Sequence, residues 1–310
     1  MINIDLQGRL GNQLFIYAMA RKLQILMEEE QKKEQKVYVN TYMTEVYNWK
    51  NSLVNYNINK NFIFYNVPLR RFKCQTPFIQ NLIRVLYRKF TYKKNSQEIY
   101  KIDKQLKKFF EAFGMYICKD GYLDFNIDPK KKNIVLYGYY QCEKYFSDIR
   151  EVLLKEFTPK NGVLEKNISL IKDIEESNSV CVTMRLGGDF VNNPIYNVCN
   201  IEYYKRGMQY IAEKIKNPKF FIFADEPEWV KKNVKFDYDV VFEEGNDPDY
   251  EKLRVMSKCK NFVIANSSFS WWVQYLSTNE NKIVVAPEKW YNDEKMVCDI
   301  YMPQWHILKV

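Results

Sequence analysis

The feature that most constrains the fold is a series of short apolar runs in the second half of the chain. The runs are "SVCVTM", "KFFIFA", "NFVIAN" and "KIVVAP", which end at residues 184, 224, 266 and 287. Each is too short for a typical helix and rich in Val, Ile and Phe, and helical patterns separate them. Because hydrophobicity along each run is continuous, both faces should be buried, which predicts a parallel sheet covered by helices. We therefore expect a Rossmann-like α/β domain, which binds ligands at the carboxyl ends of its strands.

The first half begins in a similar way but is harder to interpret. "INIDL" alternates like a short strand, and the glycine turn "QGRLG" leads into a helical pattern. "NIVLYGYYQCEKYF" predicts another strand and turn, followed by a helix through "DIREVLLKEF". Residues 28–130 predict helices around "FIQNLIRVLYRKF" and "IDKQLKKFFEAF" but no topology.

A chain of 310 residues fits two medium domains, and a turn-forming segment at Pro159, Asn161 and Gly162 marks the expected boundary. We predict domains at residues 1–158 and 159–310, with room for the C-terminal segment to pack back on the first.

Charge and cysteine content limit the class of protein. The 47 basic and 38 acidic side chains give +9, which favours anionic partners, although most lysines fall in runs typical of solvated loops. The seven cysteines, Cys74 among them, are scattered without a C-x-x-C pair, so neither a disulfide framework nor a zinc site is indicated. We expect a cytoplasmic protein.

No membrane-spanning or secretory segment is expected. The N-terminus lacks a basic region followed by an apolar one, and no run approaches the roughly 20 apolar residues that span a bilayer. The lysines leave peripheral contact with the inner face of a membrane open, but the sequence shows no convincing amphipathic anchor.

Polar residues follow three of the four apolar runs. Arg185 and Asp189 follow the first and Asp225 the second, while Asn266 ends the third and Ser267 and Ser268 follow it. Arg185 carries a planar guanidinium suited to phosphate, and Asp189 could either pair with it or take a proton from an attacking hydroxyl. In a doubly wound sheet these residues meet at one edge.

Two turns before helices are compatible with phosphate. The segment "ANSSFSWW" places N-cap residues at a helix start, and "GRLGNQ" places Gly8 and Gly11 before another helix. Ordinary capping and a turn without ligand explain them as well, and neither is a dinucleotide fingerprint or a P-loop. His306 is the only histidine, so carboxylate acid–base chemistry is favoured and a multi-histidine metal site is excluded.

The motifs "GRLGNQLFIYAMARKL", "YGYYQCEKYF", "MRLGGDF", "FFIFADEPEWVKKN" and "LRVMSKCKNFVIANSSFSWWVQYLS" occur in order along the chain. Together they resemble the motifs of bacterial α-1,2-fucosyltransferases of glycosyltransferase family 11. The resemblance leaves mainly residues 28–130 uncovered.

The resemblance implies a GT-B fold, with two Rossmann-like α/β domains facing across a cleft and no metal or other cofactor required. The C-terminal domain would bind GDP-β-L-fucose and the N-terminal one the acceptor. The 2-hydroxyl of a terminal β-galactoside, in a lactose-like or O-antigen glycan, would attack the fucose anomeric carbon with inversion.

The resemblance also assigns site residues. It implies that Arg185 binds the leaving diphosphate and that Asp189 is the base. Asp225 would contact ribose or guanine, with Glu251 a weaker guanine candidate. The remaining donor-binding candidates are Gly8, Arg9, Gly11, Asn12, Gln13, Asn266, Ser267, Ser268 and Phe269.

The sequence departs from the family pattern His-x-Arg-Arg-Gly-Asp. Thr183 replaces the histidine, Leu186 replaces the second arginine, and Gly188 is an extra residue. We hypothesise that Arg9 restores the lost charge.

Three other functions stay open from the sequence: another inverting sugar-nucleotide transferase, a catalytically silent GDP-sugar or glycan binder, and a basic RNA-binding protein. The last has no recognisable motif, so no nucleic-acid partner is expected.

Overall fold

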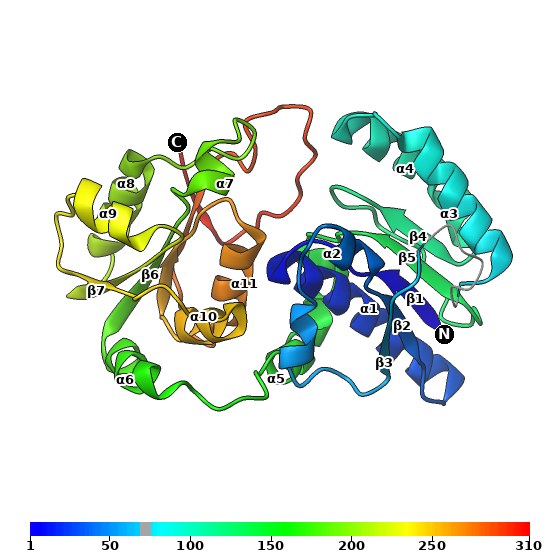
Figure 1. Ribbon diagram of the computed structural model, residues 1–310, viewed down its shortest axis with the longest axis horizontal. Coiled ribbons are helices and arrows are strands. Elements are labelled where there is room, and N and C mark those ends of the chain that lie inside the picture. Colours follow the sequence, from blue (N-terminus) through cyan, green and yellow to red (C-terminus); the bar gives the residue numbers. More distant parts are fainter. Residues whose placement is uncertain (69–75) are drawn as a thin grey trace. The chain divides into compact units, whose positions relative to one another are not determined.

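The computed structural model describes residues 1–68 and 76–310, except for the side chains of residues 189 and 190; Cys74 lies outside it. The chain divides into two compact units (Figure 1). Unit 1 comprises Met1–Thr158 and Lys295–Tyr301, and unit 2 comprises Pro159–Glu294 and Met302–Val310. Each unit contains its own parallel sheet. In the described ranges no helix is long and apolar enough to cross a bilayer.

Unit 1 contains a five-stranded parallel sheet of order β3-β2-β1-β5-β4. The two strands expected from "INIDL" and "NIVLY" are confirmed as β1 and β5, and the two expected helices as α3 and α4. The strands are β1 (Ile2–Asp5), β2 (Val37–Asn40), β3 (Phe62–Tyr65), β4 (Met115–Cys118) and β5 (Ile134–Gly138). The α-helices are α1 (Leu10–Gln31), α2 (Tyr42–Val46), α3 (Phe78–Thr91), α4 (Ser96–Ala112) and α5 (Arg150–Glu156), and the 3-10 turns are η1 (Ser52–Asn55), η2 (Glu143–Tyr145) and η3 (Ser147–Ile149).

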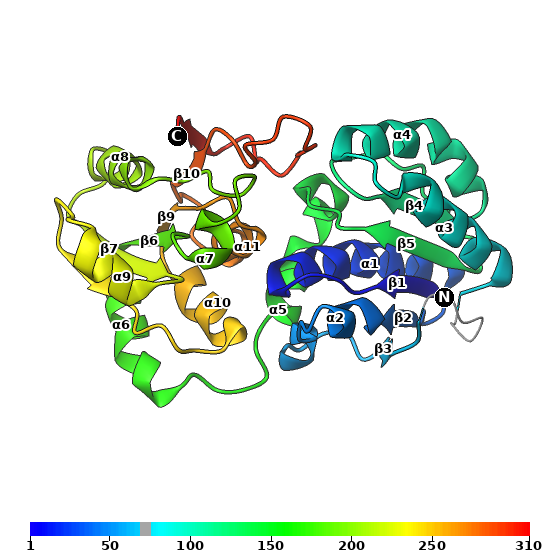
Figure 2. The ribbon, with the colours of Figure 1, turned by 45° about the horizontal axis from the view of Figure 1, so that its top comes forward.

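The alternation along β1 explains how helices cover this sheet. Ile2 lies in one row with Phe62, whose ring is 4.4 Å from that of Tyr17 in α1. Alternate residues of a strand point to opposite faces, so Asp5 lies on the other face, where it pairs with Arg84 of α3. Helix α1 therefore covers one face of the sheet, and α3 with α4 covers the other (Figure 2).

Unit 2 contains a six-stranded parallel sheet of order β11-β10-β9-β6-β7-β8. The four predicted apolar runs are confirmed as β6, β7, β9 and β10, although β9 ends at Val263. The strands are β6 (Asn178–Met184), β7 (Pro218–Ala224), β8 (Val240–Phe242), β9 (Asn261–Val263), β10 (Val284–Pro287) and β11 (His306–Leu308). The helices are η4 (Glu165–Asn167), α6 (Ile168–Glu176), α7 (Gly188–Val191), α8 (Ile201–Ala212), α9 (Pro227–Asn233), α10 (Asp249–Ser257) and α11 (Ser268–Leu276).

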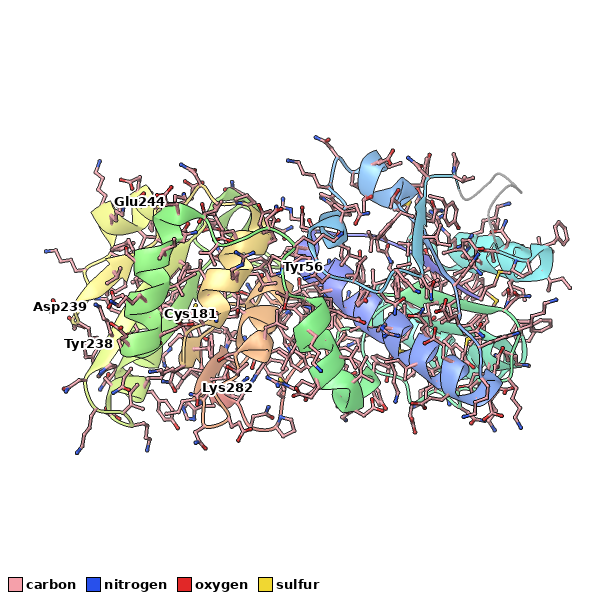
Figure 3. All side chains as sticks on the ribbon, turned by 90° about the horizontal axis from the view of Figure 1, so that it is seen from below. Tyr56, Cys181, Tyr238, Asp239, Glu244 and Lys282 are labelled. Carbon is pink, nitrogen blue, oxygen red and sulfur yellow. The ribbon has the colours of Figure 1, made fainter. Side chains whose placement is uncertain are left out.

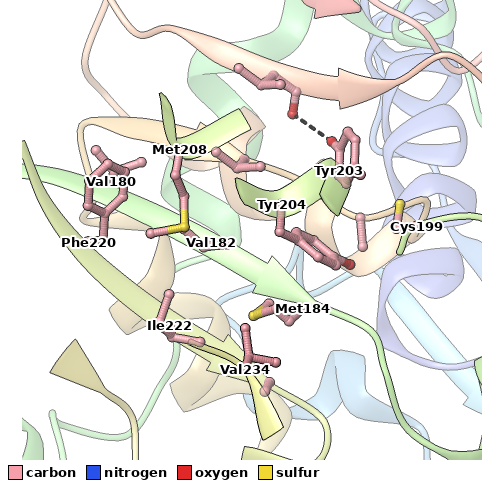
Figure 4. Packing of buried hydrophobic residues seen from close by; sticks show 14 of the residues in the cluster. Val180, Val182, Met184, Cys199, Tyr203, Tyr204, Met208, Phe220, Ile222 and Val234 are labelled. Carbon is pink, nitrogen blue, oxygen red and sulfur yellow. Dashed lines mark hydrogen bonds between the residues drawn. The ribbon is translucent and has the colours of Figure 1, made fainter. Parts of the chain in front are cut away.

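The core of unit 2 forms around the central strand β6. Val180 and Val182 pack with Met208 of α8 and Ile222 of β7 in one buried cluster (Figure 4). Cys181 points to the opposite face and is also fully buried. Burial on both faces is the physical reason that Val180, Cys181 and Val182 form a continuous apolar run within β6 rather than an alternating one.

Candidate functional site

The carboxyl edge of the unit 2 sheet brings three of the predicted segments together. Met184 of β6 is in register with Ala224 of β7, and Val182 with Val263 of β9. The three strands therefore end side by side, so Arg185, Asp225 and the turn into α11 follow at one edge.

Arg185 is held at this edge by two side chains distant in sequence. Its Nε lies 3.6 Å from Asp225 Oδ2, and its backbone N–H donates to the Tyr204 hydroxyl at 3.0 Å. Asp225 Oδ1 also accepts the Leu186 N–H at 3.0 Å. Burial raises the pKa of Tyr204 well above its ordinary value, so the hydroxyl stays protonated. Asp225 thus anchors both the side chain of Arg185 and the loop that follows it.

Gly187, which has no side chain, allows the loop after β6 to lie close to the Asp225 carboxylate. A Cβ on Gly187 would lie 2.9 Å from Asp225 Cγ and 2.9 Å from Glu226 Cγ, closer than real Cβ contacts. A Cβ on Gly188 would meet only Asn192 Nδ2 at 3.5 Å, an ordinary contact. Gly188 begins the short helix α7, which also contains the backbone of Asp189; the Asp189 side chain lies outside the described structure.

The turn from β9 into α11 leaves the helix start without a side-chain cap. Ser267 has the extended backbone of an N-cap residue, but its side chain makes no capping hydrogen bond. Ser268 and Phe269 are half-buried in the first turn. The first N–H groups of a helix and its dipole attract anions, so this end of α11 is suited to a diphosphate.

Asn266 has a different position from the one expected of a donor ligand. Its side chain is 3% exposed, and its amide donates to the carbonyls of Tyr196 and Trp290, each at 3.0 Å. Both N–H groups of the amide are therefore used to hold neighbouring loops.

Thr183, where the family pattern has histidine, connects β6 to the turn that follows β9. Its Oγ1 accepts the Ala265 N–H at 2.9 Å, and the side chain is buried. Sequence reasoning noted the substitution but not this contact, because Ala265 lies 82 positions further along the chain.

The glycine turn of unit 1 lies where β1 ends and α1 begins. Gly8 has a φ of +76°, and a Cβ there would lie 2.4 Å from Asn12 Nδ2, so only glycine fits. Arg9 is exposed at the residue before α1. Gln141 donates to Asn12 Oδ1 at 2.8 Å, which joins the "LGNQLF" motif to the turn after β5.

Gln13 is an internal support of this turn. Its amide N–H groups donate to the carbonyls of Gly8 at 2.8 Å and Lys50 at 2.7 Å, and its oxygen accepts the Ser52 N–H at 2.9 Å. The side chain is fully buried. Gly11, in the first turn of α1, is also buried.

Glu251 makes structural contacts within unit 2. It lies in α10 with no exposed surface, and its Oε1 accepts the Leu164 N–H at 3.0 Å and an Asn167 N–H at 3.1 Å. Its Oε2 lies 3.1 Å from Arg254 Nη1. These contacts fasten α10 to the segment before α6.

Other features lie away from the carboxyl edge. A surface depression at the amino ends of β7 and β8 is lined by residues 212–219, Tyr238 and Asp239. Figure 3 labels Tyr238 and Asp239. His306 stacks on Tyr210 with ring centroids 3.6 Å apart. Within the part of the chain that is described, no group of three His, Cys, Asp or Glu side chains is placed to hold a metal ion.

Comparison with known sequences gives one family. The model of Glycosyl transferase family 11 matches residues 1–309. An alpha-1,2-colitosyltransferase of Escherichia coli is 38% identical over 175 residues, which cover 54% of this chain and 59% of that enzyme. The O-antigen biosynthesis glycosyltransferase WbnK of Escherichia coli is 26% identical over 314 residues, covering 96% of this chain and 98% of WbnK.

Solved structures agree on the fold. The fucosyltransferase NodZ from Bradyrhizobium superposes with a TM-score of 0.52 at 11% identity, covering 88% of this chain and 92% of NodZ. NodZ alpha-1,6-fucosyltransferase soaked with GDP-fucose gives 0.50 at 10% identity, covering 89% and 92%. The expected fold class, GT-B with two Rossmann-like parallel sheets, is confirmed.

Proposed function

Since the chain belongs to glycosyltransferase family 11, we propose that it is a galactoside 2-α-L-fucosyltransferase. It would transfer L-fucose from GDP-β-L-fucose to the 2-hydroxyl of a terminal β-galactoside, with inversion at the anomeric carbon. The acceptor is a lactose-like or O-antigen glycan, a class to which the name of the relative WbnK also points. Cytoplasmic location fits a reaction that consumes a sugar nucleotide.

The observation that carries the proposal is the placement of Arg185 beside the start of α11 at one sheet edge. In the transfer the bond between the anomeric carbon and the diphosphate oxygen breaks, and negative charge grows on that oxygen. A guanidinium and the free N–H groups of a helix start both stabilise such charge. Arg185 and the turn of Ser267, Ser268 and Phe269 would supply this stabilisation without a metal ion.

The attacking hydroxyl needs a base. We assign this role to Asp189, whose backbone lies in α7 four residues after Arg185. Its carboxylate would take the proton as the galactose oxygen bonds to the anomeric carbon, and GDP would leave with the electron pair of the broken bond.

The other candidates take supporting roles in this proposal. Asp225 positions Arg185, in addition to any contact with ribose or guanine. In unit 1, the acceptor-side domain, Gln13 fixes the turn that carries Arg9. Arg9 would provide the positive charge that Leu186 does not.

A second donor has a specific observation in its favour. The relative with 38% identity is an alpha-1,2-colitosyltransferase, so transfer of colitose from a GDP-activated donor is the alternative. A catalytically silent binder would take the donor but transfer neither sugar.

The test is transfer to lactose by the purified chain with EDTA present and no added metal, with either donor. GDP release and product linkage are measured for the wild type, Arg185→Ala, Asp189→Asn and the control Lys231→Ala, which removes an exposed charge of α9. We expect α-1,2-fucosyllactose from the wild type and the control, and its loss in the other two variants. Turnover with the colitose donor alone would select the alternative, and full activity of Asp189→Asn would refute its role as base.

A further inference from the structure

Helix α3 of unit 1 has its two faces in the opposite arrangement from an ordinary surface helix. A surface helix normally turns its apolar stripe toward the core. In α3 five of the six exposed residues are apolar, with 44% to 62% of each residue's surface accessible, and the sixth is Lys89. We call the five apolar residues the α3 apolar face: Phe78, Ile79, Leu82, Leu86 and Phe90.

The spacing of these residues makes them one continuous surface. Phe78, Leu82 and Leu86 follow one another at intervals of four, and Ile79, Leu86 and Phe90 at seven and four. Residues at these intervals lie on the same side of a helix with 3.6 residues per turn. The face therefore extends along the whole length of α3.

Polar contacts fix the opposite side of α3 against the rest of unit 1. Arg84 Nη1 donates to Asp5 Oδ2 at 2.9 Å, and both side chains are 2% exposed. Gln80 donates to the Phe113 carbonyl at 2.7 Å, and the Tyr87 hydroxyl donates to Asp103 at 2.7 Å.

These contacts determine which side of α3 is exposed. Rotating the helix to bury its leucines would leave the Asp5 carboxylate without its guanidinium, and a buried unpaired charge is strongly unfavourable. The α3 apolar face is therefore exposed because the polar contacts on the opposite side fix the rotation of the helix.

The charges on α3 and the segment after it that are not buried are all of one sign. Besides the buried Arg84, residues 78–94 contain Arg88, Lys89, Lys93 and Lys94 and no Asp or Glu. Lys94 Nζ lies 5.4 Å from the Phe90 ring centroid, so a cation sits at the end of the face.

Helix α4, beside α3 in Figures 1 and 2, adds exposed rings. Phe109 and the C-cap residue Phe113 are 48% and 40% exposed, and their ring centroids lie 5.1 Å apart. The bond from Gln80 to the Phe113 carbonyl brings Phe113 to the first turn of α3.

We propose that the α3 apolar face docks unit 1 onto an anionic lipid bilayer. A helix with Phe and Leu on one side and Lys or Arg flanking it lies in the interface, with its apolar side among the acyl chains and its cations at the anionic headgroups. A second copy of the chain fits less well, because an isologous contact would bring two sets of lysines together. The proposal does not depend on the transfer reaction.

The test is sedimentation of the full chain with vesicles in the absence of sugar nucleotide. We expect binding to equimolar phosphatidylglycerol and phosphatidylcholine, weak binding to phosphatidylcholine alone, and release at high salt, where charge attraction is screened. The double change Leu82→Gln with Leu86→Gln should lower the partition coefficient by roughly tenfold or more. The control Val163→Gln with Ile168→Gln alters equally exposed apolar residues of unit 2 and should have no effect.

A second variant tests the charges separately. Lys89→Gln with Lys93→Gln should weaken binding by roughly fivefold for each lysine at low salt. The two leucines and the two lysines are all exposed, so the thermal unfolding of the leucine variant and of the lysine variant should match that of the wild type. Equal binding by the wild type and the leucine variant would overturn the proposal. The proposal would also be overturned if sedimentation velocity without vesicles showed a wild-type dimer that the leucine variant does not form. A second copy of the chain, rather than a bilayer, would then cover the α3 apolar face.

Discussion

Two adjacent glycines in the loop after β6 should respond very differently to the same substitution. In Gly187→Ala the new methyl group would lie 2.9 Å from both Cγ and Oδ2 of Asp225, so the carboxylate has to move. In Gly188→Ala the methyl group has only an ordinary contact, 3.5 Å from Asn192 Nδ2. Neither glycine has a positive φ, so alanine causes no backbone strain at either position. The difference between the two variants therefore measures the crowding at Asp225.

The magnitude follows from what this carboxylate holds. Moving it breaks the 3.0 Å bond from the Leu186 N–H and loosens the contact with Arg185 Nε. A hydrogen bond to a charged group contributes about 1.5 to 3 kcal/mol. If that energy positions Arg185 in the transition state, its loss lowers kcat by roughly 10- to 150-fold.

The assay is steady-state GDP release with lactose as acceptor, together with GDP affinity by calorimetry. We expect Gly187→Ala to lose kcat by this factor while remaining folded, and Gly188→Ala to stay within about twofold of the wild type. Unchanged turnover in Gly187→Ala, or equal losses in both variants, would refute the view that Asp225 positions Arg185.

Three further predictions concern other contacts. Thr183→Val should destabilise the protein by about 1 to 3 kcal/mol in urea unfolding, because the buried Ala265 N–H loses its acceptor; stability equal to wild type would contradict this. Burial raises the pKa of Asp103 from 3.8 to about 6. Between these two pH values the folded state holds a proton that the unfolded chain has lost. The stability that protonated Asp103 contributes is fully present below pH 3.8 and is lost as the pH rises through about 6. The free energy of unfolding of the wild type should therefore fall by about 3 kcal/mol relative to that of Asp103→Asn between about pH 4 and pH 7. A difference between the two proteins that does not change with pH would contradict this prediction. Arg9→Ala should weaken GDP binding in calorimetry, and an unchanged affinity would remove Arg9 from the donor site.

Sequence patterns located much of the fold because they report burial. The four continuous apolar runs correspond to β6, β7, β9 and β10, and the alternation of "INIDL" correctly separates a polar and an apolar face of β1. The strands β2, β3 and β4 were not predicted, since each has only four residues in a region rich in polar and aromatic side chains. The shared sheet edge of Arg185, Asp225 and Asn266 followed from the order of apolar runs and turns alone.

The sequence by itself determined the parallel sheet of unit 2, the glycine turn before α1 and the residues that follow the predicted strands of unit 2. Only the tertiary structure decided how these residues are used: Asp225 contacts Arg185, and Gln13 and Asn266 turn their amides inward. It also decided that the leucines of α3 point outward, because Arg84 pairs with Asp5. The reason is that apolar periodicity records whether a residue is buried, whereas its partner depends on sheet order and helix rotation, which bring together residues tens of positions apart.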